Sequence, residues 1–426
     1  MDLIIKNAAV YGDAALKDVY IEHGSIIKIE DSGEKRGEYR LANAIDAEGH
    51  LLLPGFIDMN CDVCDPGYEN KESIASVTRS AAKGGFTSIT CLPVTNPPID
   101  NKAVVQYIIS KSRNEALVNV FPYGHMTKEG AGAEMAEIGG MQRAGVVAVS
   151  DGNRSVNDTW LLKNIMRYSL MFDIPVVTFC ENKTLAKNGV MNEGRISAKT
   201  GLLGIPKDAE ETAVAVNLVL AANTGAKLHI THVSTATAVE LIRYAKSKGV
   251  GVTCDTCPHY FTLSEDMLCD YDTIFKVNPP LRTEADVAAV KRGLKDGTID
   301  AIASGHSPAS KESKLVEFDR AAAGISSVET AFAVSFTELV RNGDLTLKEL
   351  TNKFSFLPAE ILNLKNKGVL APGYDADLTV IEKNGAYTID PSEFASKAKF
   401  SPYKGKTVNG RTLYTIVNGK IVYIAD

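Results

Sequence analysis

The chain of 426 residues is longer than one ordinary compact domain, so it predicts two or three units or one large α/β barrel with additions. Hydrophobic residues make up 45% and charged residues 23%, which excludes a disordered or low-complexity chain. The 46 basic and 52 acidic side chains give a net charge of −6. Because no run rich in Lys and Arg is present, we expect no nucleic-acid binding.

No apolar stretch approaches the roughly 18 residues of a membrane-spanning helix. Residues 1–6 lack the basic start and apolar core of a signal peptide. Seven scattered cysteines are typical of reduced thiols rather than of a disulfide framework. We therefore expect a cytoplasmic protein that makes no contact with a membrane.

Both ends of the chain carry short runs of β type separated by Gly and charged turns. These runs lie at residues 3–5, 18–21, 25–29, 377–381 and 414–423. The last of them contains Asn418-Gly419, a dipeptide typical of a two-residue hairpin turn. The two ends therefore predict one small β domain assembled from residues 1–53 and 366–426.

The middle of the chain, residues 54–365, alternates expected strands with expected helices. The strands are predicted at residues 56–60, 86–91, 118–123, 146–150, 175–179, 227–232, 251–254 and 299–303. The helices are predicted at residues 73–83, 160–170, 210–220, 236–247 and 285–294, where apolar residues recur every three or four positions. Eight strands with intervening helices favour an α/β fold of the (β/α)8 TIM-barrel type, with the site just beyond the carboxyl ends of the strands.

Seven short segments, in register along nearly the whole chain, resemble those of dihydroorotases, which belong to the amidohydrolase superfamily. They are residues 54–59 (PGFIDM), 65–72 (DPGYENKE), 82–87 (AKGGFT), 229–235 (HITHVST), 276–282 (KVNPPLR), 297–303 (GTIDAIA) and 372–378 (PGYDADL). The resemblance implies a barrel with a β-sandwich completed by both termini. It also implies zinc and the interconversion of dihydroorotate and carbamoyl-aspartate in pyrimidine synthesis.

The first metal motif of the family, His-x-His-x-Arg after the first strand, is replaced here by Asn60, Asp62 and Cys64. Asn60 is a poor zinc ligand, although Asp62 and a Cys64 thiolate are able to bind a metal. The guanidinium that pairs with the substrate carboxylate in the family is absent, and a thiol cannot replace it.

Further departures follow at the ends of later strands. Val94 stands where the family has an Asn that holds the substrate carboxylate, and Phe179 stands where it has a ligating His. Gly305 lacks the carboxylate of the general acid–base, and Ala309 lacks a second contact to the substrate. Three residues do match positions of the family site: Asp151, His232 and Asn278.

A catalytic zinc takes about three protein ligands and a water, so the surviving groups do not predict one. We expect no cofactor, with Asp62, Asp151 and His232 as residual candidates for a weak or rearranged metal site. Cys61-x-x-Cys64 and Cys254-x-x-Cys257 have the spacing of half-sites for a zinc-thiolate centre. Period-2 alternation, however, places the Cys61 side chain toward the surrounding helices, which favours buried apolar thiols.

Three hypotheses of function follow. The leading one is a catalytically degenerate dihydroorotase homologue, a pseudoenzyme retained as an assembly partner of aspartate transcarbamoylase, as the resemblance implies for inactive relatives. The second is an active dihydroorotase or other cyclic amide hydrolase with a rearranged site that uses Asp62, Cys64, Asp151, Cys180 or His232. The third is a non-catalytic sensor of a small ligand. The resemblance also implies a homodimer or a higher oligomer.

Overall fold

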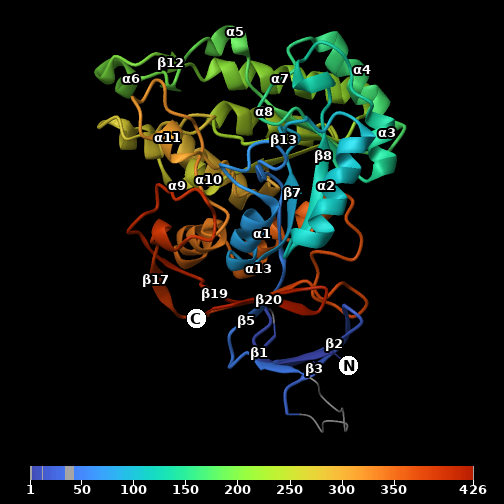
Figure 1. Cartoon of the computed structure of the whole chain (residues 1–426). Helices are drawn as coiled ribbons and strands as arrows, with labels where there is room; N and C mark the ends of the chain where they lie inside the picture. Colours follow the sequence, from blue (N-terminus) through green and yellow to red (C-terminus); the bar gives the residue numbers. More distant parts are fainter. Residues whose placement is uncertain (1, 12, 34–42, 426) are drawn as a thin grey trace.

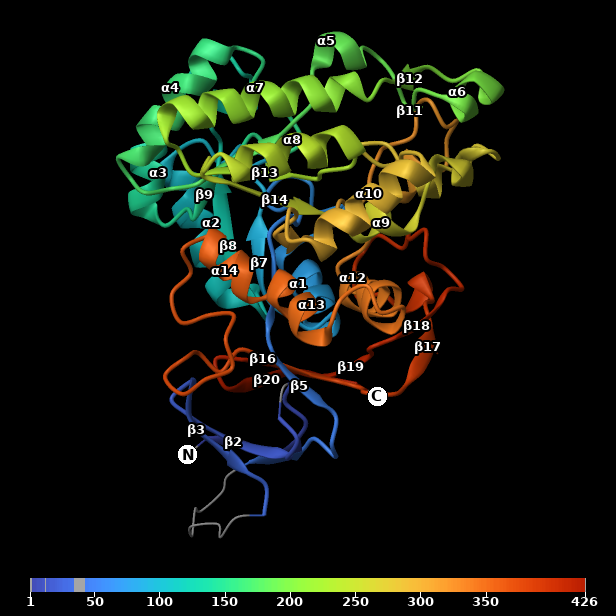
Figure 2. The ribbon, with the colours of Figure 1, turned by 180° about the vertical axis from the view of Figure 1, so that it is seen from behind.

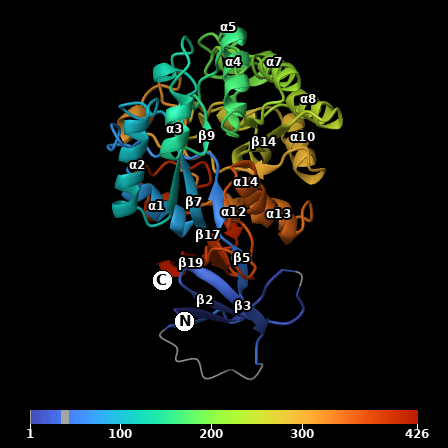
Figure 3. The ribbon, with the colours of Figure 1, turned by 90° about the vertical axis from the view of Figure 1, so that its right-hand side faces the viewer.

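The computed structural model describes residues 2–11, 13–33 and 43–425. A barrel forms the upper part of the molecule, and a smaller β domain lies beneath it with the N-terminus (Figures 1 and 3). Met1, the first residue of the segment inspected for a signal peptide, lies outside the described residues. The fold predicted from the strand and helix pattern is confirmed.

Eight parallel strands form the barrel sheet in the order β15-β14-β13-β10-β9-β8-β7-β6. Their bounds are β6 Phe56–Asp58, β7 Phe86–Cys91, β8 Asn119–Gly124, β9 Ala148–Val149, β10 Val176–Phe179, β13 Leu228–Thr231, β14 Val252–Thr256 and β15 Ala301–Ile302. A parallel bridge between Cys61 and His306, just beyond β6 and β15, joins the first and the last strand. The fourth and the eighth strand are shorter than predicted, because only two residues of each make ladder hydrogen bonds.

Helices cover the outside of the barrel. The main ones are α1 Ile74–Lys83, α2 Lys102–Glu115, α3 Ile138–Ala144, α4 Thr159–Leu170, α7 Asp208–Thr224, α8 Ala236–Ser247, α10 Glu284–Lys295, α12 Ala331–Ser335, α13 Leu347–Phe354 and α14 Phe356–Ile361. All five predicted helices are present. The prediction at 210–220 was too short, because Asp208, Glu210 and Glu211 favour the N-terminal turn and Gly225, at φ +74°, ends the helix.

Two four-stranded sheets make up the smaller domain. One has the order β3-β2-β1-β4 and the other β20-β19-β16-β5. Their bounds are β1 Leu3–Ala8, β2 Lys17–Glu22, β3 Ser25–Asp31, β4 Ala44–Asp46, β5 Leu51–Pro54, β16 Leu378–Ile381, β19 Thr412–Val417 and β20 Lys420–Ile424. Buried residues of both sheets, such as Ile5 and Val380, share one core, so the two ends of the chain form a sandwich.

The predicted hairpin turn at Asn418-Gly419 joins β19 to β20, with positive φ at both residues. One part of the C-terminal segment lies against the barrel rather than in the sandwich. The hairpin of β17 (Ala386–Thr388) and β18 (Thr407–Asn409) packs against α12 of the barrel. The residues at which one domain gives way to the other stay a prediction.

Candidate functional site

Three of the predicted site residues meet inside the mouth of the barrel, where β6, β10 and β13 end. Asn60 Nδ2 donates to Thr231 Oγ1 over 3.3 Å and lies 3.4 Å from His232 Nδ1. The Phe179 ring stands edge-on to the His232 ring, with 6.3 Å between the centroids. All three side chains are buried, so the mouth is packed with groups that contact one another.

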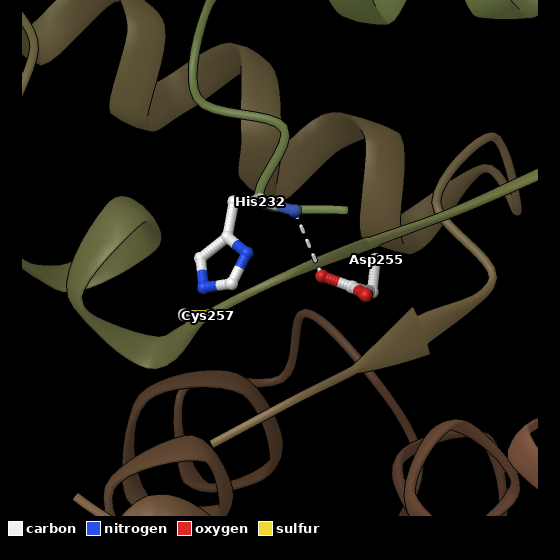
Figure 4. Close-up of side chains that lie close together, drawn as sticks. All are labelled: His232, Asp255 and Cys257. Carbon is white, nitrogen blue, oxygen red and sulfur yellow. Dashed lines mark hydrogen bonds between the residues drawn. The ribbon is translucent and has the colours of Figure 1, made fainter. Parts of the chain in front are cut away.

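His232 follows the last residue of β13 in a left-handed conformation, with φ +62°. Its backbone N–H donates to Asp255 Oδ1 over 2.9 Å (Figure 4). Thr231 Oγ1 gives its single proton to Asp255, so His232 Nδ1, 2.9 Å away, is the donor in their contact. Burial lowers the pKa of His232, which leaves a neutral ring with a lone pair on Nε2.

Asp255, on β14, is the acceptor that organises this end of the barrel. Its Oδ2 accepts from His229 Nε2 and from Thr231 Oγ1, each over 2.9 Å, and its Oδ1 accepts the His232 N–H. Burial alone would raise the pKa of Asp255, but the hydrogen bond and charge of His229 outweigh it and hold the pKa below its usual value. The carboxylate is therefore ionised and already bonded at both oxygens.

Among the residues that the structure describes, one group of three potential metal donors comes together: His232, Asp255 and Cys257. The donor atoms lie within 4.8 Å of one another, and all three side chains are buried (Figure 4). Burial, followed by the charge of Asp255, raises the pKa of the Cys257 thiol well above its usual value. A metal bound here would have to displace that proton, because the thiolate is the ligand.

The residual candidates named from the sequence do not form such a group. Asp151 accepts from the backbone N–H groups of Met126 and Thr127, from Thr127 Oγ1 over 2.6 Å and from His125 Nδ1 over 3.1 Å. Asp62 accepts the N–H of Cys64 over 3.2 Å, and burial raises its pKa. The donor set therefore does not fit the two-zinc centre that the resemblance implies.

The positions expected to hold a substrate carboxylate carry no cation. Cys64 is 2% exposed, and burial raises the pKa of its thiol far above the usual value. Val94 is partly buried and packs against Gly152, where a Cβ would lie 2.7 Å from Val94 Cγ1. Ala309 is buried in the wall of a cavity that Lys71 and Lys311 also line.

Gly305 and Asn278 are the remaining two residues of the site predicted from the sequence. Gly305 has φ +64°, and a Cβ there would lie 2.7 Å from Cys257 Sγ and 3.0 Å from His259 Cε1. Asn278 Oδ1 is buried without a hydrogen-bond partner within the described part of the chain, and so is His259 Nδ1. Burial, followed by His232, lowers the pKa of His259 to about 3, so its ring is neutral.

Sequence patterns did not identify the grouping of His232 with Asp255 and Cys257. They also missed the hydrogen bond between His229 and Asp255 and the contact of His125 with Asp151. Period-2 alternation on β14 contains part of the missing signal, because Asp255 and Cys257 share the inward face. The contact between His125 and Asp151 joins the ends of two neighbouring strands, which spacing alone does not show.

The cysteines lie on two sides of the strands. Cys61 belongs to the buried core that also contains Ile74 and Val77 of α1, on the side that its phase predicted. Cys254 belongs to the same outer core, whereas Cys257 packs inside the barrel. All seven cysteines are free thiols, and the two Cys-x-x-Cys segments do not meet as a four-thiolate site.

Comparison with known proteins agrees with this architecture. Residues 49–238 match the family model described as "Dihydro-orotase-like", and residues 326–423 match the "Amidohydrolase family" model. A dihydroorotase from Acetivibrio thermocellus is 48% identical over 407 residues, which cover 96% of this chain and 94% of that protein. One from Caldanaerobacter subterraneus is 45% identical over 426 residues, which cover 99% and 97% of the two chains.

Among solved structures, L-hydantoinase (dihydropyrimidinase) from Arthrobacter aurescens superimposes with a TM-score of 0.90 at 25% identity. The match covers 100% of this chain and 97% of that chain. No helix in the described ranges is long and apolar enough to cross a membrane.

Proposed function

The chain belongs to the dihydroorotase family of the amidohydrolase superfamily, and we propose that it is a non-catalytic member retained as an assembly partner of aspartate transcarbamoylase. The observation that carries the proposal is the state of the barrel mouth. His232, Asp255, Thr231 and Asn60 bond to one another there, in the place where an enzyme of this family needs ligands open to a metal.

Catalysis of ring closure requires an activated water, a carboxylate to move the proton and a cation to hold the substrate carboxylate. Gly305 supplies no carboxylate, and Cys64, Val94 and Ala309 supply no cation. Phe179 fills the space beside His232 with an apolar ring. The absence of a carboxylate at position 305 and of a cation at positions 64, 94 and 309 supports the proposal that the family reaction is lost.

The assembly role is supported by what the chain keeps. In the residues that the structure describes, the barrel and the sandwich each have a buried core, and these cores involve the ends of the chain as well as its middle. A chain that keeps this scaffold but lacks the catalytic groups is suited to bind another protein through its surface. Free thiols at all seven cysteines accord with the cytoplasm, where we place the protein.

The test uses purified components. The chain is mixed with aspartate transcarbamoylase from the same organism, and the mass of the mixture is measured by light scattering after gel filtration. The proposal predicts a stable complex and a carbamoyl-aspartate cyclisation rate at background. Independent elution of the two proteins over the concentrations tested would contradict the assembly role.

A second candidate, an active hydrolase with a rearranged site, is favoured by the grouping of His232, Asp255 and Cys257. Co²⁺ added to the protein would then give a thiolate-to-metal absorption band. Cys257→Ser would remove that band, whereas Cys61→Ser, at an equally buried thiol on the outer side, would keep it. Absence of the band in the parent protein would rule out this metal site.

A third candidate, a sensor without turnover, is favoured by the unpartnered Asn278 Oδ1 and His259 Nδ1. Buried polar atoms without partners are costly, and a bound ligand with matching groups would satisfy them. Dihydroorotate and carbamoyl-aspartate are the probes to use. A rise in melting temperature without product would support this role, and no rise at millimolar probe would exclude it for these two compounds.

A further inference from the structure

A cavity of about 290 Å³ lies beyond the carboxyl ends of β6 and β15. Its wall is made by the loops that follow these two strands and by the segment that joins β17 to β18. Figure 2 shows that segment running beside α12 and α9 (Pro258–Thr262), on one side of the barrel. Four of the ten residues that line the cavity are lysines: Lys71, Lys311, Lys397 and Lys399.

The four ammonium groups make the cavity positive in a chain whose net charge is −6. Glu312 is the one acidic residue among the ten described residues that line it. The contacts of the ammonium groups are with uncharged groups. Lys397 Nζ donates to the backbone oxygen of Glu69 over 2.6 Å, and Lys399 Nζ donates to another backbone oxygen. Lys71 Nζ lies over an aromatic ring, so these contacts leave the positive charges unneutralised.

Buried hydrogen bonds hold the walls of the cavity in place. Glu72 is fully buried and accepts from Ser396 Oγ, which joins the loop after β6 to the segment between β17 and β18. Ser326 binds that segment twice, since its Oγ donates to Ala398 O and its N–H to Phe400 O, each over 2.8 Å. These bonds flank positions 71, 397 and 399, so the backbone that carries three of the lysines is fixed before a ligand binds.

We propose that this cavity binds a phosphate compound with several negative charges, such as the polyphosphate group of a nucleotide. Lysine binds phosphate as a compact point charge, whereas the planar fork of arginine is the better match for a single carboxylate. None of the ten described residues in the wall is an arginine. The volume is at the lower end of the roughly 300–1,000 Å³ of small-molecule sites, which suits a phosphate group with the rest of the molecule outside.

The proposal does not depend on the proposed function, because a catalytic and a non-catalytic chain would have the same cavity. Its ligand also differs from the metal considered above. A metal at His232, Asp255 and Cys257 would need a buried thiolate and a carboxylate, whereas the lysine cavity attracts anions.

Isothermal titration calorimetry of the full chain with inorganic tripolyphosphate is the first test, because this probe carries the charges without a base or a sugar. We expect one site per chain, with an affinity that falls as salt is added, since the lysines are open to solvent. Succinate at the same ionic strength should bind far more weakly. Absence of binding up to about 1 mM tripolyphosphate, or equal binding of succinate, would overturn the proposal.

The variant pair is Lys311→Gln with Lys397→Gln, which removes two charges from exposed side chains of the cavity. Tripolyphosphate binding should weaken about 25-fold, at about fivefold for each lysine. The control is Lys295→Gln with Lys365→Gln, two exposed lysines outside the cavity, which should change the affinity by less than about twofold. Equal weakening by the two pairs would show that only the net charge matters, and it would overturn the proposal. Because all four side chains are exposed, circular dichroism should show the parent fold in both.

Reductive methylation of lysines, measured by mass spectrometry after digestion, locates the bound anion. Tripolyphosphate should slow the methylation of Lys311, Lys397 and Lys399 and leave that of Lys295 and Lys365 unchanged. Equal protection of both groups, or of neither, would place the anion elsewhere and overturn the proposal. An oligoglutamate peptide that protects the same lysines and binds more tightly than tripolyphosphate would assign the cavity to an acidic protein partner, which would also overturn it.

Discussion

The Cys257 thiol lies where a side chain on Gly305 would begin: a Cβ at position 305 would be 2.7 Å from Sγ. Gly305 also has φ +64°, a conformation that costs other residues about 1–2 kcal/mol. Position 305 lacks the family carboxylate, and position 257 carries a thiol. These two features are linked, because the thiol fills the space that a side chain at position 305 would need.

Replacing Gly305 with Asp should destabilise the protein by about 3 kcal/mol or more, because the new side chain meets sulfur and adopts an unfavourable φ. Gly305→Asp combined with Cys257→Gly should recover part of that loss, since the space beside Cβ is freed. Urea unfolding of the two single variants and the double variant measures this coupling. Strictly additive effects would show that the two positions do not share the space.

Phe179 occupies the barrel mouth as a core residue, 2% exposed. Phe179→Ala should lower the free energy of unfolding by about 3–5 kcal/mol, the usual cost of a large buried cavity. Phe356→Ala, at a ring that is 38% exposed, serves as the control and should cost clearly less. Equal losses in urea unfolding would mean that the ring of Phe179 is not packed as the structure shows.

Asp151 accepts three hydrogen bonds at Oδ1 and one at Oδ2, so an amide in its place would turn its N–H₂ group toward at least one of these donors. Asp151→Asn should cost about 3 kcal/mol of stability, as expected for a buried charged acceptor. Asp173→Asn is the control, because that carboxylate is 74% exposed and pairs with Lys227 at the surface. If chemical denaturation found no difference between the two variants, Asp151 would not have this structural role.

Asp58 should give the protein a measurable pH dependence. Burial, opposed by hydrogen bonds from Ser304, raises its pKa to about 6, whereas an unfolded chain has an Asp pKa of about 3.9. The folded form thus binds the proton more tightly, so this contribution to stability is complete below about pH 4 and is lost as the pH rises through about 6.

Asp58→Asn removes that titration and keeps an oxygen for the N–H groups of Ser304 and Asn60. Relative to the parent chain, the variant should therefore gain roughly 2–3 kcal/mol between pH 4 and pH 7. The measurement is urea unfolding of both proteins across that range. Parallel pH curves for the two proteins would contradict the raised pKa.

Alternation along the strands predicted part of the site, because side chains two positions apart on a strand lie on the same face of the sheet. The family resemblance assigned Phe179 and His232 to the site, and alternation directed Asn60 into the barrel and Cys61 to the outer side. Alternation did not place Asp151, whose carboxylate bonds to the loop that follows β8. Such a contact depends on how two strand ends curve, which the spacing of residues does not encode.

The hydrogen bond between His229 and Asp255 shows a second limit of prediction from sequence. Each residue lies at a strand position that alternation directs inward, but their meeting depends on the register between β13 and β14, where His229 pairs with Thr253. The match to the family site includes His232 but not these neighbouring residues, so that match alone did not indicate them. Comparing adjacent strands in register, rather than single motifs, would have identified them.

The most direct test of the central claim is the ring closure of carbamoyl-aspartate by the purified protein with added zinc, beside the dihydroorotase of Acetivibrio thermocellus assayed identically. We expect a rate at background that does not respond to zinc or to a chelator, while the control protein is active. A clear rate that a chelator abolishes would contradict it, and Cys257→Ser would then show whether His232, Asp255 and Cys257 hold the metal.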